Sequence, residues 1–393
     1  MQDLKLVLDL GNGYIKGIIF AKEGDSTVVI SKDTVKTKGM RKGKILDVDD
    51  FVYSIRALFE SFEKKLGGDF IDEIYVGLSH PDMKIKRISE QKRVMNESIQ
   101  QDDMDHLTNL ISETSGEQNY ETIKIIPVQW IIDEQMRLKD PTGMQGKKLE
   151  ITADVFSIPK NFYNTLVEVF EKLEIDVVDI VPNLLGASES AIDFDDKDLG
   201  TLLIDIGNNQ TSFVVYEEGF PITYGVVPIG GEEVTKDISI GLQVDIKDAE
   251  KIKKEKGTAL LEDQSQEDES IDVAFLSDVI TARYEEIFEH INEYLVQLGK
   301  DSRLPGGVVL VGGGAKMNNV EKLSKEYFKL VTFFGKDKVY NISDVSTKLQ
   351  YINTIGVNAW VDKYGVGSGG FSMSMGVGLG WVKKVIKYIK DMF

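Results

Sequence analysis

Apolar and polar positions follow the same pattern in two stretches of the chain, LVLDLGNGYIKGIIF at residues 6–20 and LLIDIGNNQTSFVVY at residues 202–216. The two stretches align without a gap, so that Asp9 matches Asp205. In each, an apolar run ends in an Asp-x-Gly-Asn turn and a second apolar run follows. This pattern predicts a β-hairpin whose turn tolerates positive φ and exposes N–H groups to an anion. One such hairpin is common without any ligand, but two matching copies half a chain apart predict duplicated domains that face a shared cleft.

A third stretch, GGVVLVGGGAKMNNVEKL at residues 306–323, predicts a buried strand, a triple-glycine turn and a helix capped near Asn318 or Asn319. Glycine lets a backbone pass close to a bound base or phosphate, although a glycine-rich loop without a ligand fits the pattern too. Upstream, two glycines open a predicted helix, and a charged helix follows on which Glu250 and Lys253 share a face. Such a pair is also typical of a solvated surface.

The C-terminal residues form a different pattern from the rest of the chain. Residues 362–379 are rich in glycine and poor in charge, which predicts a flexible linker. Residues 380–393 then predict an amphipathic helix that is too short to span a bilayer but can lie in its interface. A helix docked on the protein's own core is the alternative. The residues that the helix would present to an anionic membrane surface are Trp381, Val382, Lys383, Lys384, Val385, Ile386, Lys387, Ile389, Lys390 and Phe393.

Composition excludes several classes of function. The chain has 393 residues, 42% of them hydrophobic, and a net charge of −19, which argues against binding to nucleic acid. It has no cysteine, and its three scattered histidines, His80, His106 and His290, predict no metal cluster. Asp3 and Asp9 interrupt the N-terminus before a signal peptide could form, and no apolar run is long enough to cross a membrane. We therefore expect a globular protein of the cytoplasm with several domains.

The hairpin, second hairpin and triple-glycine turn, in that order, resemble the phosphate-1, phosphate-2 and adenosine motifs of the actin superfamily of ATP-binding proteins. Residues 181–192 resemble the connect 1 helix of that superfamily, and residues 351–361 resemble connect 2. The resemblance covers residues 4–361. It implies an α/β, actin-like fold of two duplicated, ribonuclease H-like domains with an ATP cleft between them.

Two further stretches, residues 38–56 and residues 127–159, resemble the FtsA family of bacterial division proteins. The second stretch contains a DPTGM-x-G-x-x-L-E run that is close to a signature of that family. FtsA proteins carry an inserted subdomain, called 1C, and end in a similar amphipathic helix. The resemblance implies these boundaries: 1–81 and 159–198 for domain 1A, 82–158 for subdomain 1C, 199–229 and 301–361 for domain 2A, 230–300 for subdomain 2B, 362–379 for the linker and 380–393 for the membrane-targeting helix.

Subdomain 1C shows no catalytic pattern of its own. Its sequence predicts an acidic helix over residues 100–115 and strands over residues 123–133 and 148–157, joined by a Pro-Thr-Gly turn. An assembly surface is the better interpretation, and FtsA-like proteins are thought to polymerise through this subdomain.

The resemblance to actin-like proteins also implies a set of site residues. Asp9 and Asp205 would hold hydrated Mg²⁺ through water, or would cap their hairpin turns. Lys16 would bind phosphate, or would be an ordinary surface lysine. The full set of expected nucleotide-binding residues is Asp9, Gly11, Asn12, Gly13, Tyr14, Lys16, Asp205, Gly207, Asn208, Asn209, Gln210, Thr211, Gly230, Gly231, Glu250, Lys253, Gly312, Gly313, Gly314 and Ala315.

Hydrolysis of ATP is expected to be slow at most. Actin-like ATPases usually present Gln or Glu near the start of connect 1 to orient the attacking water, and Val181 aligns there. Asp179 lies two residues away, which keeps it on the same face only in a strand. Because orienting water is a main contribution of proteins to phosphoryl transfer, the sequence predicts a weak ATPase and no confident catalytic residue.

The resulting hypothesis is an FtsA-like protein that binds ATP and Mg²⁺, polymerises on the cytoplasmic face of the cell membrane at the division site and tethers FtsZ filaments there. The C-terminal tail of FtsZ would bind subdomain 2B, where Arg283 suits an acidic peptide, although a solvated helix arginine explains it equally well. A kinase would need a sugar-binding aspartate and a chaperone would need a further domain. A PilM-like or other actin-fold scaffold outside division is the remaining alternative.

Overall fold

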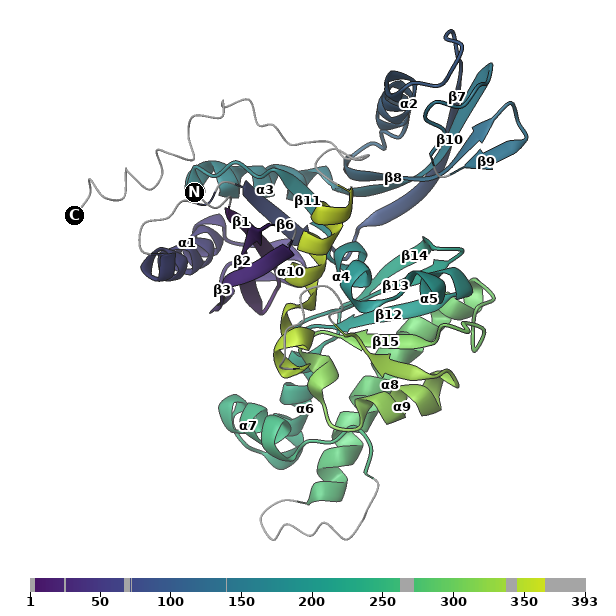
Figure 1. The fold of residues 1–393 in the computed structure, drawn as a ribbon. Coiled ribbons are helices and arrows are strands. Elements are labelled where there is room, and N and C mark those ends of the chain that lie inside the picture. Colours follow the sequence, from purple (N-terminus) through teal and green to yellow (C-terminus); the bar gives the residue numbers. More distant parts are fainter. Residues whose placement is uncertain are drawn as a thin grey trace, which may run out of the picture.

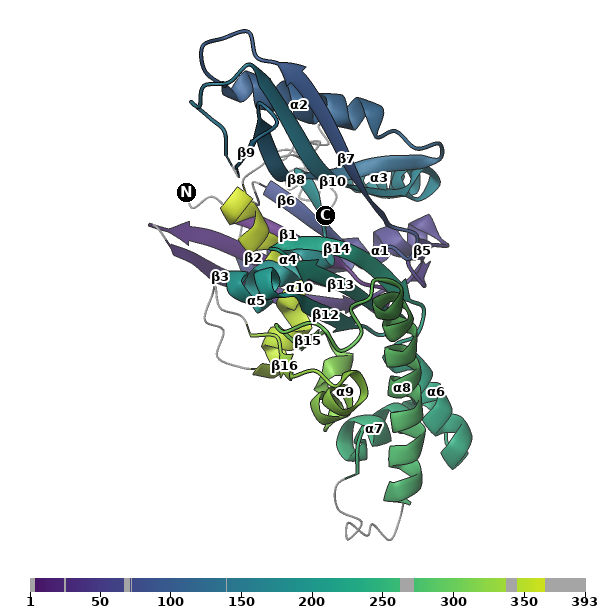
Figure 2. The ribbon, with the colours of Figure 1, turned by 90° about the vertical axis from the view of Figure 1, so that its right-hand side faces the viewer.

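The protein consists of two α/β domains and one projecting subdomain, as the computed structural model shows (Figure 1). Turning the molecule by 90° shows subdomain 1C extending away from both domains at one end and the helices of subdomain 2B at the other (Figure 2). The structure describes residues 4–24, 26–66, 71, 73–138, 140–261, 272–336 and 345–364.

Domain 1A contains a five-stranded sheet in the order β11-β6-β1-β2-β3. The first three strands form an antiparallel meander, and β6 and β11 continue the sheet in parallel with β1. Helix α1 buries Phe51, Ile55, Leu58 and Phe62, whose spacing places them on one face. The elements are β1 (Leu4–Leu10), β2 (Tyr14–Glu23), β3 (Ser26–Lys36), the short pair β4 (Met40–Arg41) and β5 (Lys44–Ile45), α1 (Val48–Leu66), β6 (Glu73–Leu78), α3 (Lys160–Leu173) and β11 (Asp179–Pro182).

Domain 2A repeats this arrangement, with a sheet in the order β14-β13-β12-β15-β16. An antiparallel meander is again followed by two parallel strands, so the predicted duplication and both predicted hairpins are confirmed. The elements of domain 2A and subdomain 2B are α5 (Phe194–Leu199), β12 (Thr201–Ile206), β13 (Thr211–Glu217), β14 (Phe220–Val227), α6 (Gly231–Leu242), α7 (Ile246–Lys256), α8 (Val273–Gln297), β15 (Val308–Val311), the 3-10 turn η1 (Gly314–Lys316), α9 (Val320–Phe328) and β16 (Thr332–Phe334).

Subdomain 1C is a four-stranded sheet in the order β7-β10-β8-β9, with helix α2 packed against it. The predicted acidic helix and the two long strands are present. Strand β9 was not predicted from the sequence; it pairs with the end of β8, before the Pro-Thr-Gly turn. A run of three residues is too short to show a strand period. The elements are β7 (Lys84–Arg93), α2 (Gln101–Thr114), β8 (Tyr120–Ile132), β9 (Met136–Leu138) and β10 (Lys148–Pro159).

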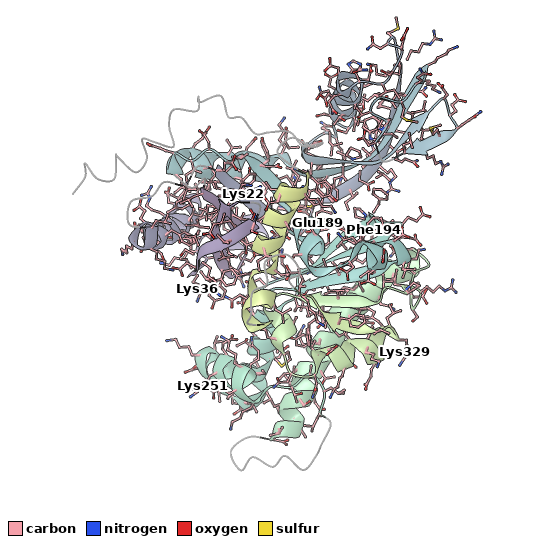
Figure 3. All side chains as sticks on the ribbon, viewed as in Figure 1. Lys22, Lys36, Glu189, Phe194, Lys251 and Lys329 are labelled. Carbon is pink, nitrogen blue, oxygen red and sulfur yellow. The ribbon has the colours of Figure 1, made fainter. Side chains whose placement is uncertain are left out.

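Two helices, α4 (Asn183–Ala191) and α10 (Val345–Tyr364), connect the domains and cross each other (Figure 1). They cross at glycines, because a Cβ on Gly356 would lie 2.2 Å from the Gly186 carbonyl oxygen. Glu189, near the end of α4 (Figure 3), accepts hydrogen bonds from Lys197 and Lys363, each at 2.7 Å. These contacts join the two connecting helices and α5.

Helix α10 continues to Tyr364, so the linker does not begin at residue 362 as predicted. The reason is that polar residues at this end of the helix have partners in domain 1A: Asp362 accepts hydrogen bonds from Lys5 and Thr27, each at 3.0 Å. The rest of the predicted linker and the predicted amphipathic helix at 380–393 lie outside the described residues. Within the described part of the chain, no helix is both long enough and apolar enough to cross a membrane.

Candidate functional site

A cavity of about 620 Å³ lies between the two domains. Both hairpins, the triple-glycine turn and helix α7 contribute to it. Of the nucleotide-binding residues expected from the sequence, the following line it: Asp9, Gly11, Asn12, Gly13, Tyr14, Lys16, Asp205, Gly207, Asn208, Asn209, Gln210, Gly231, Glu250, Lys253, Gly313 and Gly314.

Four expected residues lie behind the cavity wall. Thr211 is buried and donates to the Ile229 carbonyl at 2.9 Å, and Ala315 is part of the core of domain 2A. Gly230 packs against the second hairpin turn. Gly312 has a φ of +89°, and a Cβ there would lie 2.1 Å from Asp205 Oδ1. These four residues shape the loops that face the cavity.

The two hairpin turns meet at the cavity. A Cβ on Gly13 would lie 2.6 Å from the Asn208 Cβ, so the first turn has room for glycine only. The turn of the second hairpin is held by the start of α6, where Gly231 N–H donates to the Gly207 carbonyl at 3.0 Å. The paired hairpins predicted from the sequence therefore face each other.

Each hairpin places one carboxylate at the cavity. Asp9 lies opposite Lys16 in the β1–β2 ladder, and Lys16 Nζ is 2.9 Å from Asp9 Oδ2. Burial by itself lowers the pKa of Lys16, but the carboxylates of Asp9 and Asp205 outweigh it and the pKa is raised. Burial raises the pKa of Asp205, against a hydrogen bond from Asn353 and the charge of Lys16. The ammonium group of Lys16 thus interacts favourably with both carboxylates, that of Asp9 in a direct ion pair and that of Asp205 through its charge.

Amides from the two connecting helices complete this cluster. Asn183, the first residue of α4, donates to Asp9 Oδ1 at 2.8 Å, and Asn353 of α10 donates to Asp205 Oδ2 at 2.9 Å. Neither residue was predicted from the sequence, because their helices carry other polar side chains, such as Ser188 and Thr354, and no pattern sets these two asparagines apart.

The donor set of the cluster fits a hydrated Mg²⁺ ion. The buried side-chain oxygens of Gln210 and Asn353, two residues that line the cavity, have no hydrogen-bond partner among the described residues, so they can accept from metal-bound water. Mg²⁺ usually keeps several waters and binds one or two carboxylates together with substrate phosphates. No group of three or more His, Cys, Asp or Glu side chains that could hold a metal occurs among the described residues. With two carboxylates at the cavity, the protein side of the site suits an ion held partly through water.

The other end of the cavity is built by subdomain 2B and the triple-glycine turn. Lys253 Nζ donates to the Gly231 carbonyl at 2.8 Å and to Thr235 Oγ1 at 2.7 Å, and it pairs with Glu250 at 2.6 Å. Burial lowers the pKa of Lys253, although Glu250 opposes the shift. Both residues line the cavity, so the Glu250–Lys253 pair belongs to the candidate site.

The triple-glycine turn is fixed by Tyr284 of α8, whose hydroxyl donates to the Gly314 carbonyl at 2.8 Å. Gly313 has open space where a side chain would be. Besides Asn183 and Asn353, the cavity-lining residues that the sequence analysis did not name as nucleotide-binding are Leu10, Thr34, Ser79, Ser212, Lys254, Gly257, Tyr284, Lys316, Met317, Asn318 and Gln350.

Val181 does not lie at the cavity, although it was expected beside the attacking water. It is fully buried in strand β11 and belongs to the core of domain 1A. The residue of connect 1 that reaches the cavity is Asn183, because the chain turns into α4 there. Asp179 is also buried away from the cavity, in an ion pair with Lys124.

Arg283 lies on α8 and is already paired. Its Nε and Nη2 atoms donate to the two carboxylate oxygens of Asp237 on α6 at 2.7 and 3.0 Å. It also pairs with Glu286, one turn along α8. In this structure Arg283 joins two helices of subdomain 2B.

Comparisons with known proteins identify relatives over most of the chain. The family model described as "Cell division protein FtsA" matches residues 202–356, and that described as "SHS2 domain inserted in FTSA" matches residues 82–157. The chain is 33% identical to "Cell division protein FtsA" of Bacillus subtilis (strain 168) over 340 residues, which cover 83% of this chain and 77% of that protein. It is 25% identical to the protein of the same description from Pseudomonas aeruginosa, over 94% of this chain and 91% of that protein.

Solved structures with the same fold have more distant sequences. A chain of a "PilM-PilN type IV pilus biogenesis complex" superposes with a TM-score of 0.62 at 14% identity, covering 91% of this chain and 97% of that chain. MreB5 of Spiroplasma citri bound to ADP superposes with a TM-score of 0.55 at 15% identity, covering 92% and 96%. At such identities these neighbours show the actin-like fold alone.

Proposed function

From the fact that this chain belongs to the FtsA family of actin-like cell-division proteins, we propose that it binds ATP and Mg²⁺ in the cleft between its domains, assembles into filaments on the cytoplasmic face of the membrane at the division site, and tethers FtsZ there. The observation that carries the nucleotide part is the meeting of Asp9, Asp205 and Lys16 at one cavity, with an open glycine turn at its other end.

The chemistry of the cavity suits a nucleoside triphosphate. Lys16 and the hairpin N–H groups supply positive potential for phosphates, and Asp9 and Asp205 suit the hydrated cation that accompanies them. Glu250 and Lys253 offer polar groups for the ribose, and the open face at Gly313 leaves room for the base. The volume of about 620 Å³ is typical of a small-molecule site. MreB5, a neighbour with this fold, was solved with ADP bound.

Hydrolysis remains expected to be slow, for a reason that differs from the one drawn from the sequence. The connect 1 residue at the cavity is Asn183, a neutral amide whose N–H₂ group is held by Asp9. Glu250, a further carboxylate at the cavity, is paired with Lys253. Bound ATP would then act mainly by holding the two domains together for assembly.

Attachment to the membrane rests on the C-terminal segment at residues 380–393. Full burial of each large apolar side chain contributes about 1.5–3 kcal/mol, and each lysine near an anionic leaflet adds about 1 kcal/mol. These terms outweigh the cost of ordering a short helix. With a net charge of −19, the chain as a whole would gain little from an anionic surface without this segment.

Self-association and FtsZ binding are assigned to the two projecting parts. Subdomain 1C exposes Met95, Met136 and Met144, apolar side chains that suit contact with a second copy of the chain. Subdomain 2B exposes Ile240 and Ile246 near the α6–α8 pair, which suits the C-terminal tail of FtsZ. An acidic residue of that tail would have to compete with Asp237 for Arg283.

The nucleotide site is tested by changing Gly313 to Leu. The added side chain would enter the open space of the cavity without touching the fold, so ATP affinity measured by calorimetry should fall at least about 100-fold, or 2.8 kcal/mol. The melting temperature should stay near the wild-type value. Gly116→Leu is the matched control, because Gly116 is an exposed glycine of subdomain 1C with room for a side chain. Unchanged ATP affinity in Gly313→Leu would contradict the assignment.

A further inference from the structure

Asn353 links the two carboxylates of the cavity across the domain boundary. Its Nδ2 atom lies 2.9 Å from Asp205 Oδ2, on domain 2A, and 3.4 Å from Asp9 Oδ2, on domain 1A. The side chain is only 5% exposed. It therefore donates to carboxylates from both domains while belonging to neither hairpin.

Helix α10, which carries Asn353, is itself attached to both domains. Tyr351 shares a 2.7 Å hydrogen bond with Thr34 of domain 1A. The Leu349 carbonyl accepts a hydrogen bond of 3.2 Å from Gly312 N–H of domain 2A. Asn353 thus lies on a helix that is hydrogen-bonded to both domains, so the position of the helix depends on how the two domains are oriented.

The orientation of the Asn353 amide follows from its neighbours. Ionised carboxylates only accept hydrogen bonds, so the N–H₂ group must face Asp9 and Asp205 and the Oδ1 atom must point elsewhere. That oxygen is buried and has no partner among the described residues. Asn183 on the other connecting helix also donates to Asp9, but its own Oδ1 packs against Gly77 of β6.

An unpaired buried oxygen is costly, so the Asn353 amide calls for a hydrogen-bond donor at the cavity. Phosphate oxygens and carboxylates cannot serve, because they are acceptors. Water bound to a divalent cation is a strong donor and is expected between these carboxylates.

We propose that Asn353 is a positioning residue that holds Asp9 and Asp205 together and accepts a hydrogen bond from a water of the hydrated cation. Through it, binding of the cation is coupled to closure of the two domains along α10. This inference rests on the proposed nucleotide site and names a residue that makes the site depend on Mg²⁺.

The test compares ATP affinity by calorimetry at graded Mg²⁺ concentrations and in EDTA. Asn353→Leu keeps the approximate volume but removes the donor and the acceptor. Loss of a partner that orients metal ligands typically costs 10–100-fold in metal affinity, so the Mg²⁺ concentration that gives half of the full ATP affinity should rise by about that factor. Affinity in EDTA should change much less, whereas a merely structural defect would weaken binding in both conditions alike.

Two further variants keep the test decisive. Asn358→Leu is the matched control, because Asn358 is a buried asparagine of the same helix whose amide donates to Asp362 at 3.1 Å instead of to the cavity carboxylates. It should leave the ratio of affinities with and without Mg²⁺ at the wild-type value. Asn353→Asp places a third carboxylate beside Asp9 and Asp205, so it should lower the melting temperature without metal and enlarge the stabilisation that Mg²⁺ gives. If the two substitutions merely damaged the helix, Asn353→Leu and Asn353→Asp should not change the dependence on Mg²⁺ in opposite directions.

The outcomes separate this inference from the proposed function. If the wild type bound ATP in a Mg²⁺-dependent manner and both Asn353 variants kept the wild-type dependence, the role of Asn353 would be overturned while the nucleotide site stood. If the wild type bound no ATP under any condition, the nucleotide site would be wrong and the role of Asn353 would be overturned with it. A rise of tenfold or more in the Mg²⁺ requirement of Asn353→Leu, with the control unchanged, would support the inference.

Discussion

Changing Lys124 to Met is expected to loosen subdomain 1C from the nucleotide-binding domain. Lys124 lies on β8 and is fully buried, and its ammonium group pairs with Asp179 on β11, which is itself 2% exposed. Strand β11 leads directly to Asn183 at the cavity. The ion pair therefore joins the assembly subdomain to a strand that ends at the proposed ATP site.

The size of the effect follows from the charge that is left behind. Removing one partner of a buried ion pair costs about 3–5 kcal/mol, because the other charge stays buried without compensation. Burial already raises the pKa of Asp179 against the opposing charge of Lys124. Without Lys124 that pKa should rise further, so the folded state would bind a proton that the unfolded state releases. The loss of stability relative to wild type should therefore grow as the pH rises from the folded-state pKa of Asp179 in the wild type to the higher one in the variant, both of which lie above the unfolded value of about 3.9.

The assay is urea unfolding at two pH values, read by hydrogen exchange in separate elements, because a chain of several domains need not unfold in one step. Protection should be lost first in β7, β8 and β10. The double variant Lys124→Met, Asp179→Leu should recover much of the stability, since replacing a buried pair by apolar residues is often neutral. Among the described residues, Asp179 Oδ1 has no hydrogen-bond partner.

Lys172→Met is the matched control, because Lys172 forms an exposed pair with Asp49 that should contribute little. The reasoning would be refuted if Lys124→Met unfolded at the same urea concentration as this control, or if its deficit did not change with pH.

Three other changes to the chain test the remaining parts of the proposal. Removing residues 379–393 should leave a protein that binds ATP but no longer sediments with anionic vesicles, and Ile386→Asp should have nearly the same effect; sedimentation of the truncated protein as complete as that of the intact one would remove the main support for membrane attachment. Val181→Glu should destabilise the fold by about 3–5 kcal/mol without raising ATP turnover, because it buries a lone carboxylate in the core. A wild-type turnover on the order of 1–100 per second would contradict the weak ATPase.

The hairpins show how far local pattern reaches. Their apolar runs, the Asp-x-Gly-Asn turns and the match between residues 6–20 and 202–216 predicted both hairpins and the duplication, and the structure confirms them. The start of α6 at Gly231 and the acidic helix α2 were predicted in the same way. In each case the signal lies within a few residues, because turn chemistry and strand or helix period are properties of neighbouring positions.

Local sequence pattern could not predict which way the side chains of a helix point. Glu250 and Lys253 were recognised as a pair, but the same spacing fits a solvated face or a cavity wall. The packing of α6 decides between these two possibilities, because Lys253 donates hydrogen bonds to the Gly231 carbonyl and to the Thr235 hydroxyl of that helix. Similarly, Val181 and Asn183 differ by two positions, yet one is in the core and the other at the cavity, because the strand ends between them.

By itself, then, the amino-acid sequence determined the repeated strands, the glycine turns, the order of the motifs and the contrast between an acidic chain and a basic end. Only the tertiary structure decided which polar groups meet: Asn353 with Asp9 and Asp205, Lys124 with Asp179, and Arg283 with Asp237. The physical reason is that strand period and turn geometry depend on short-range sterics, whereas these pairs join residues far apart in the chain. Such residues come within hydrogen-bond distance only after the sheets and connecting helices have packed.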